Sequence, residues 1–147
     1  MKLGKTKYSS PMGITSLRKK LSEHLKINNK IKANIDNIII TSGAKMSLTL
    51  ALSSILKKNM SILNINPCYP SYIPQILISE HQAKIINFDL KKNDFSIDFE
   101  KLKSLIEKYK VKVMLINFPN NPTGITLDKN SRKKIVELIY KYKIILI

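Results

Sequence analysis

The sequence has very little cysteine, histidine or acidic side chain. Its 147 residues contain one cysteine, Cys68, and two histidines, His24 and His81. A single thiol excludes a disulfide framework and any zinc cluster built on cysteines. Neither histidine has a metal-ligand partner three or four positions further on, so no metal motif is recognisable. No serine stands in a Gly-x-Ser-x-Gly elbow, and nothing in the sequence is typical of a self-contained hydrolase.

Long apolar runs are also missing. Aliphatic stretches such as 38–40 and 144–147 are far shorter than the ~20 residues that a membrane-spanning helix requires. Residues 1–8 are charged and lack the apolar core of a secretory signal, so we expect a cytoplasmic protein. A hydrophobic fraction of 44% is nevertheless enough to build a core. The length corresponds to one domain at roughly 150 residues per domain.

Acidic residues number 10 against 26 lysines and arginines, which gives a formal net charge of +16. Only Arg18 and Arg132 are arginines, the residue that binds phosphate and guanine in a bidentate way. The lysines are scattered, and isoleucine and asparagine, which share their A/T-rich codons, are abundant too. A drift in base composition would enrich all three. The composition favours a solvated lysine-rich surface, and a nucleic-acid-binding face stays open as the alternative.

Apolar periodicity predicts an alternation of helices and short strands. Helices are expected where apolar residues recur every three or four positions, at 16–26, 46–57, 71–79, 99–109 and 128–142. Strands are expected in the aliphatic segments 37–41, 61–66, 84–88, 111–117 and from 143 onward. Strands that alternate with helices of this length are typical of a parallel sheet flanked by helices. The fold class is therefore α/β, in three layers with a mainly parallel sheet.

The turn between the expected strand at 37–41 and the following helix carries a glycine, Gly43. A glycine permits close backbone approach there, and the amides at a helix N-terminus can bind a phosphate. Residues 42–45 (Ser-Gly-Ala-Lys) match neither the loop of nucleotide hydrolases nor Gly-x-Gly-x-x-Gly. Two interpretations stay open: a phosphate site, or a glycine that only turns the chain.

Two further candidates follow strand ends, where open α/β sheets bind ligands. Tyr69, within 67–72 (Pro-Cys-Tyr-Pro-Ser-Tyr), could stack on a planar heterocycle or could close the core. In the segment 120–124 (Asn-Asn-Pro-Thr-Gly), an asparagine amide could donate to a ligand, or the segment could be a turn capped by its asparagines. Cys68 is most simply a small buried residue, since no helix dipole or fixed histidine activates it.

In this order, the segments resemble the N-terminal part of the large domain of fold-type-I pyridoxal-phosphate (PLP) aminotransferases of class I and II. Within that group the chain is similar to the prokaryotic aspartate aminotransferases. The matching motifs are 4–8 (Gly-Lys-Thr-Lys-Tyr), 13–18 (Gly-Ile-x-x-Leu-Arg), 40–45 (Ile-Thr-Ser-Gly-Ala-Lys), 67–72 (Pro-x-Tyr-x-x-Tyr) and 120–124 (Asn-Asn-Pro-Thr-Gly). They specify the superfamily better than the substrate. A PLP-dependent lyase and a histidinol-phosphate aminotransferase therefore stay open.

The resemblance implies a role for each motif in binding pyridoxal 5′-phosphate. Gly43, Ala44 and Lys45 would form a cup for the cofactor phosphate, with the backbone amides of residues 44 and 45 facing it. Tyr69 would stack on the pyridine ring. Asn121 would donate to the phenolic oxygen, which favours the phenolate.

The resemblance also implies a partner and a reaction. Tyr8 would reach the cofactor phosphate of a neighbouring subunit, which implies a homodimer. The expected reaction is PLP-dependent transfer of an amino group between an amino acid and a 2-oxo acid. The family's Schiff-base lysine, its aspartate for the pyridinium nitrogen and its arginines for phosphate and α-carboxylate would all follow Ile147. We therefore expect residues 1–147 to form part of one large domain and not to transaminate alone.

The family's sheet order, 3-2-4-5-6-7-1, adds an expectation about pairing. Strands 3, 2, 4 and 5 would be neighbours in this chain, whereas strand 1, at 37–41, would lie apart with unpaired backbone groups. The chain is therefore interpreted as a fragment. Two other classes stay open: a non-enzymatic aminotransferase-like module that binds polyanions, and a degenerate product without a function.

Overall fold

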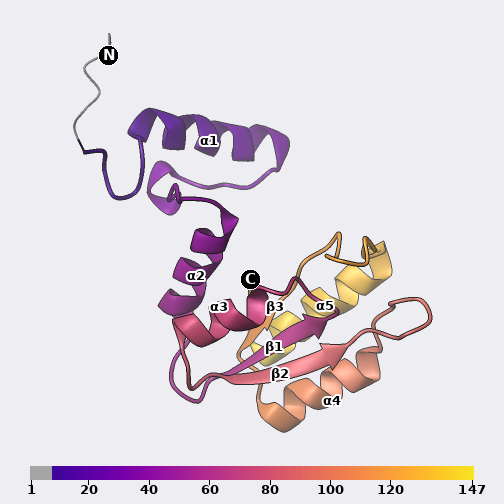
Figure 1. Ribbon diagram of the computed structural model, residues 1–147. Coiled ribbons are helices and arrows are strands. Elements are labelled where there is room, and N and C mark those ends of the chain that lie inside the picture. The colour runs from indigo at the N-terminus through magenta and orange to yellow at the C-terminus, as the bar shows by residue number, and fades with distance from the viewer. Residues whose placement is uncertain (1–7) are drawn as a thin grey trace. The chain divides into compact units, whose positions relative to one another are not determined.

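The structure is a computed structural model that describes residues 8–147 (Figure 1). The described chain divides into two compact units, one up to Ser47 and one from Leu48 to Ile147. The first unit contains helix α1 (Thr15–Asn28) and the short 3-10 helix η1 (Ile35–Asn37). Helix α2 (Ala44–Ile55) begins in the first unit and ends in the second.

The first unit is held together by side chains of α1. Arg18 is buried, and its guanidinium Nη1 donates to the carbonyl of Ile35 at 2.9 Å. The hydroxyl of Ser22 donates to the carbonyl of Ala33 at 2.5 Å. These bonds fix the segment that returns from α1 toward η1. The helix confirms the expected one at 16–26 and is slightly longer at both ends.

The expected strand at 37–41 is wrong. Helix η1 ends at Asn37, and within the described residues 38–41 have no place in the sheet. Ile38 is still extended, with φ −119° and ψ 124°, and the amide of Ile40 donates to the carbonyl of Met12 at 3.0 Å. The aliphatic sequence gives an extended backbone, but a strand also requires a neighbouring strand to pair with. The resemblance does imply that this segment lies apart from the other strands.

The second unit contains a four-stranded sheet in which all the pairs are parallel (Figure 1). Its strands are β1 (Ser61–Asn66), β2 (Lys84–Asp89), β3 (Val113–Leu115) and β4 (Ile145–Leu146), in the order β2-β1-β3-β4. This is the 3-2-4-5 order that the resemblance implies. The predicted fold class, a mainly parallel α/β sheet, is confirmed. The first strand has the predicted bounds, while β3 is shorter than the expected 111–117.

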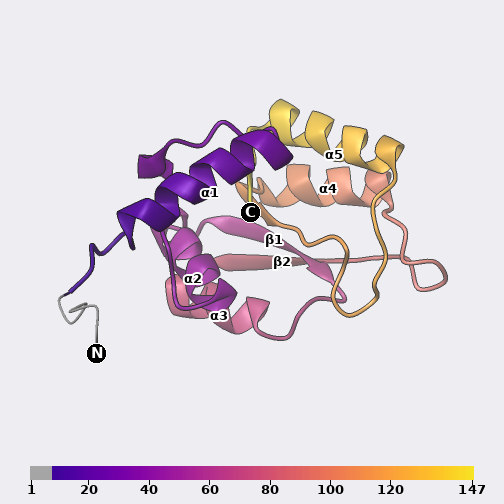
Figure 2. The same cartoon turned by 90° about the horizontal axis from the view of Figure 1, so that it is seen from above.

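Helices cover both faces of this sheet (Figure 2). Along β1, Leu63 and Ile65 pack on the face covered by α4 (Phe99–Tyr109) and α5 (Lys129–Tyr142). Ile62 points to the opposite face, which carries the second-unit part of α2 and α3 (Tyr72–Ser79). This alternation follows from the two-residue period of a strand. The sheet is therefore buried between two helical layers, as predicted.

Aspartates fix where α4 and α5 begin. The carboxylate of Asp98 accepts from the amide of Lys101 at 3.0 Å, and that of Asp128 accepts from the amide of Ser131 at 2.7 Å. Each bond satisfies an amide that the first turn of a helix leaves unpaired. The predicted helix at 99–109 is confirmed, and Asp98 caps it from the preceding position.

Because β1 and β3 are neighbours in a parallel sheet, the loops that follow them leave from the same edge of the sheet.

Candidate functional site

Gly43 lies in the turn that leads into α2, as predicted. Its φ is +88°, in the left-handed region that glycine adopts without strain. The first hydrogen bond of the helix ladder runs from the amide of Ser47 to the carbonyl of Gly43 at 3.2 Å. The amides of residues 44–46 precede that bond, at the electropositive end of the helix. Ala44 and Lys45 are exposed and occupy the first turn, which contains no acidic residue.

A second glycine, Gly13, explains why the motif at 13–18 belongs with this turn. Gly13 has φ +96°, and a Cβ placed on it would lie 2.6 Å from the Cβ of Ile40. The backbone therefore approaches the chain that leads into Gly43 too closely for any other residue. Arg18 of the same motif donates to the carbonyl of Ile35, which precedes Ile40 in that segment. The sequence motif was recognisable, but this contact was not predicted.

In the second unit, the loop after β1 and the loop after β3 are joined by Asn120. This residue is buried, and its side-chain amide donates to the carbonyl of Pro67 at 3.1 Å. Its carboxamide oxygen accepts from the amide of Thr123 at 3.3 Å and from the Thr123 hydroxyl at 2.7 Å. The structure thus brings the segment of Tyr69 next to the segment of Asn121. Asn120 was absent from the predicted site.

Asn120 and Asn121 divide the two roles that the sequence left open for this segment. Asn120 closes the turn, since its carbonyl accepts from the amide of Gly124 at 2.7 Å and its own amide donates to Ile125 at 2.8 Å. Gly124 has φ +73°. Asn121 is exposed beside this closed turn. The capping interpretation is therefore correct for Asn120, and Asn121 stays available for a ligand.

Tyr69 is partly buried and packs edge-to-face with Tyr72, the first residue of α3. The ring centroids lie 5.7 Å apart at an interplanar angle of 70°. Burial raises the pKa of the Tyr72 phenol, and the neighbouring Cys68 and Tyr69 groups raise it further. Tyr72 therefore stays protonated at neutral pH and supports the Tyr69 ring as a neutral neighbour.

A polar side chain inside β1 also reaches the Tyr69 loop. Asn64 is fully buried, and its amide nitrogen lies 2.9 Å from Asn66 Oδ1 and 3.4 Å from Cys68 Sγ. It also lies 3.4 Å from Oδ1 of Asn87, its register partner on β2. Cys68 is half-buried and accepts one of these contacts, which supports its structural interpretation. The signal for Asn64 was an asparagine within the apolar run 61–66.

Other predicted residues remain separate or undescribed. Tyr8 is exposed, and residues 4–7 of its motif lie outside the described residues. Its role toward a second subunit stays a prediction. Within residues 8–147, no group of three histidine, cysteine or acidic side chains is placed to hold a metal. None of the helices described in this chain is both long and apolar enough to span a membrane.

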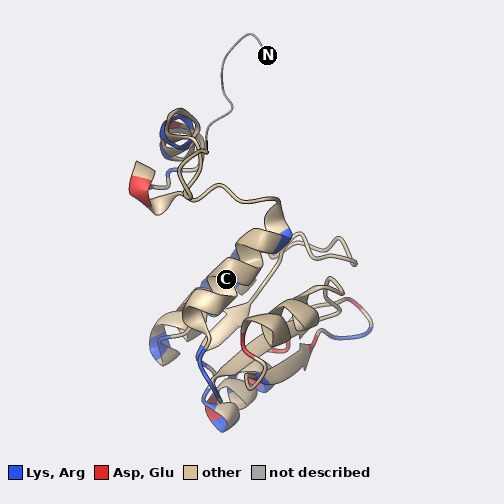
Figure 3. Cartoon of the chain, turned by 60° about the vertical axis from the view of Figure 1, so that its left-hand side comes forward, with Lys and Arg blue, Asp and Glu red and all other residues tan. Residues whose placement is uncertain are grey.

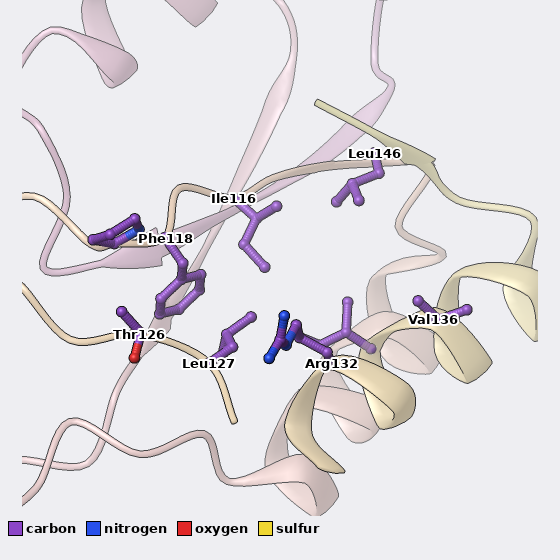
Figure 4. A pocket seen from close by; sticks show the side chains of 9 residues that line it. Ile116, Phe118, Thr126, Leu127, Arg132, Val136 and Leu146 are labelled. Carbon is purple, nitrogen blue, oxygen red and sulfur yellow. The ribbon is translucent and has the colours of Figure 1, made fainter. Parts of the chain in front are cut away.

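An apolar pocket of about 660 Å³ lies beside β4 and α5 (Figure 4). It contains one charged side chain, Arg132, among aliphatic and aromatic neighbours. Its other labelled lining residues are Ile116, Phe118, Thr126, Leu127, Val136 and Leu146. None of the predicted cofactor-binding residues lines it. The predicted cofactor-binding residues and this apolar pocket therefore lie in different places.

Comparison with known proteins places this geometry in a family. The model of aminotransferases of class I and II matches residues 3–147. A probable aspartate aminotransferase of Methanocaldococcus jannaschii is 38% identical over 144 residues, covering 98% of this chain and 37% of that relative. A (5-formylfuran-3-yl)methyl phosphate transaminase of the same organism is 37% identical over 143 residues, covering 96% of this chain and 34% of that relative.

A solved structure of an aminotransferase has the same fold as this chain. The aspartate aminotransferase of Thermotoga maritima matches with a TM-score of 0.88 at 27% identity, covering 99% of this chain and 38% of that protein. This chain thus spans between 34% and 38% of the length of these relatives. The family match extends over nearly every residue, and the parallel sheet and its flanking helices have the fold of these enzymes. The chain therefore belongs to the family of class I and II aminotransferases.

Proposed function

We propose that this chain supplies cofactor-binding elements of a PLP-dependent aminotransferase that moves an amino group between an amino acid and a 2-oxo acid. The observation that carries the proposal is the family match over residues 3–147, together with relatives named as aspartate aminotransferases. An aspartate-type substrate is the first expectation. The furan-phosphate transaminase is nearly as similar, so the amino-group transfer is better supported than the substrate.

The residues at the start of α2 fit a phosphate group. Gly43 turns the chain at a positive φ, and three amides precede the first bond of a twelve-residue helix. A dianion at this end gains hydrogen bonds and a favourable interaction with the helix dipole. Gly43, Ala44 and Lys45 would hold the phosphate through their backbone.

The loops of the second unit fit the aromatic part of the cofactor. Tyr69 offers a partly buried ring after β1, and stacking on a planar heterocycle contributes about 0.5–1.5 kcal/mol beyond burial. The exposed Asn121 amide would donate to the phenolic oxygen and so favour its ionised form. When bound, PLP supplies an electron sink for chemistry at the substrate α-carbon. The residues of this chain would bind and orient it.

Probes without an aldehyde test binding, because they cannot react with the many lysines. Pyridoxine 5′-phosphate should bind this chain more tightly than pyridoxine does. Gly43→Glu should remove that difference, because a carboxylate at the helix N-terminus repels the phosphate. Gly43→Gln is the matched control, since it carries the same backbone strain without the charge. Equal binding of the two probes to the unaltered chain would refute the phosphate site.

Covalent attachment is tested separately. We expect borohydride reduction with PLP, followed by peptide mapping, to give scattered adducts on surface lysines. The resemblance implies that the family's Schiff-base lysine would follow Ile147. One dominant adduct within the chain would show that this placement is wrong.

Tyr8 and the homodimer belong to the same proposal. Tyr8 is exposed, as a residue that reaches a second subunit would be in a single chain. Sedimentation of the chain, with and without pyridoxine 5′-phosphate, tests whether two copies of the chain associate.

Nucleic-acid binding is the weaker alternative. Lysines and arginines are spread over helices and loops, with acidic residues among them (Figure 3). The expected result is weak, non-specific DNA binding that disappears as salt is raised. Site-selective binding at physiological salt would favour the alternative.

A further inference from the structure

We propose that Asn120 is a positioning residue that holds the Tyr69 loop and the Asn121 loop in one fixed frame. This inference rests on the proposed function, because the frame matters only if both residues contact one ligand. The tests below separate the two ideas.

Both ends of the Asn120 carboxamide are used. Its nitrogen donates to the Pro67 carbonyl at 3.1 Å, and its oxygen accepts twice from Thr123, at 3.3 Å and 2.7 Å. The residue is only 6% exposed, so water competes little for these bonds. One buried side chain therefore closes its own turn and connects it to a loop 53 positions away in the sequence.

The two connected loops carry the residues that would contact the ring. Pro67 is two positions before Tyr69, and Asn120 is adjacent to Asn121. The bond between Asn120 and Pro67 therefore restricts the distance between the stacking face and the amide donor. A ring that stacks on Tyr69 can receive the Asn121 hydrogen bond only if that distance is maintained.

The other side of the Tyr69 loop is held from the sheet. Buried Asn64, within strand β1, donates to Cys68 Sγ at 3.4 Å. The loop is thus fixed to rigid β1 through Cys68 and to the second loop through Pro67. Asn120 is the element of this arrangement that makes the position of one loop depend on the other.

Two substitutions separate the two halves of the Asn120 side chain. Asn120→Asp keeps an oxygen that can accept from Thr123 but removes the N–H that donates to Pro67. Thr123→Val removes the hydroxyl that donates to Asn120 and leaves the bond to Pro67. Circular dichroism and thermal unfolding of the whole chain first establish that both variants are folded.

The first measurement uses no ligand. Amide NMR shifts and hydrogen exchange are compared in the two loops of the unaltered chain and the variants. Asn120→Asp should change residues 68–72 as well as 121–125, whereas Thr123→Val should change only 121–125. If residues 68–72 are unaffected in folded Asn120→Asp, the two loops are not coupled and the proposal is overturned. If Asn120→Asp does not fold, Asn120→Ser provides the same comparison with a shorter side chain.

The second measurement uses pyridoxine 5′-phosphate. Loss of one buried hydrogen bond corresponds to about tenfold in affinity, and we expect that loss for Asn120→Asp but not for Thr123→Val. The pKa of the bound probe's phenol, followed by ultraviolet absorbance, should also rise in Asn120→Asp, because the Asn121 amide is displaced. Binding and phenol titration that match the unaltered chain would overturn the positioning role alone. Absence of binding to the unaltered chain would instead overturn the proposed function, and the positioning role with it.

Discussion

Gly13→Ala should destabilise the first unit strongly, because it strains the backbone and brings the new Cβ into Ile40. At φ +96° an alanine is strained by ~1–2 kcal/mol, the usual cost of a left-handed residue with a Cβ. The new Cβ would also lie 2.6 Å from Ile40 Cβ and 2.7 Å from Ile40 Cγ1. Overpacking of this kind adds ~1–3 kcal/mol. The total is about 2–5 kcal/mol.

Gly43→Ala is the matched control for Gly13→Ala. Gly43 has a similar φ of +88°, but among residues 8–147 no atom beyond its own chain neighbours lies within 4 Å of the added Cβ. Its cost should therefore be the backbone strain alone, about 1–2 kcal/mol. Hydrogen exchange of the α1 amides measures the stability of this unit separately from the sheet.

A second-site change tests the contact directly. Ile40→Gly removes both contacting atoms, after which the nearest remaining atom is Ile40 Cα at 3.6 Å. The pair Gly13→Ala with Ile40→Gly should cost less than the sum of the two single changes. The reasoning is refuted if Gly13→Ala costs no more than Gly43→Ala, or if the two changes are additive.

Three more predictions concern the second unit. Phe88→Ala, at a fully buried position, should cost ~3–5 kcal/mol in urea unfolding, whereas Ile78→Ala, at a position that is 75% exposed, should change stability little. Hydrogen bonds from the Ser131 amide and hydroxyl lower the pKa of Asp128. The cap should therefore stabilise α5 fully at pH values above the normal aspartate pKa, and this stabilisation should be lost as the pH falls through the lowered pKa. Asp128→Asn should reduce that acid dependence of the unfolding temperature. Tyr69→Ala should weaken pyridoxine 5′-phosphate binding by about two- to tenfold, and Tyr69→Trp should retain it.

Local patterns were sufficient to predict much of the second unit. Strand β1 has its predicted bounds because aliphatic and polar residues alternate in Ser61–Asn66 and the following Pro-Cys-Tyr-Pro segment forces a turn. The cap at Asp98 is recognisable in the sequence because an aspartate directly precedes the amphipathic segment 99–109. These features depend on neighbours within a few positions, which is the information that a single sequence carries.

The failures involve partners that are distant in the sequence. An extended segment such as 38–41 becomes a strand only if another strand lies beside it, and the described sheet offers none. The choice between Asn120 and Asn121 depends on the Pro67 carbonyl, which the sequence does not place.

The acceptor in the bond from Asn120 is a main-chain carbonyl, and this has a consequence for sequence variation. Every amino acid presents the same carbonyl, so position 67 can vary in side chain while the bond persists, provided that the loop keeps its path. Position 120 has no such freedom, because few side chains both donate and accept at this length. In a large set of relatives the two positions would therefore show no correlated substitution. Methods that infer contacts from paired changes would miss this connection, although it spans the candidate site.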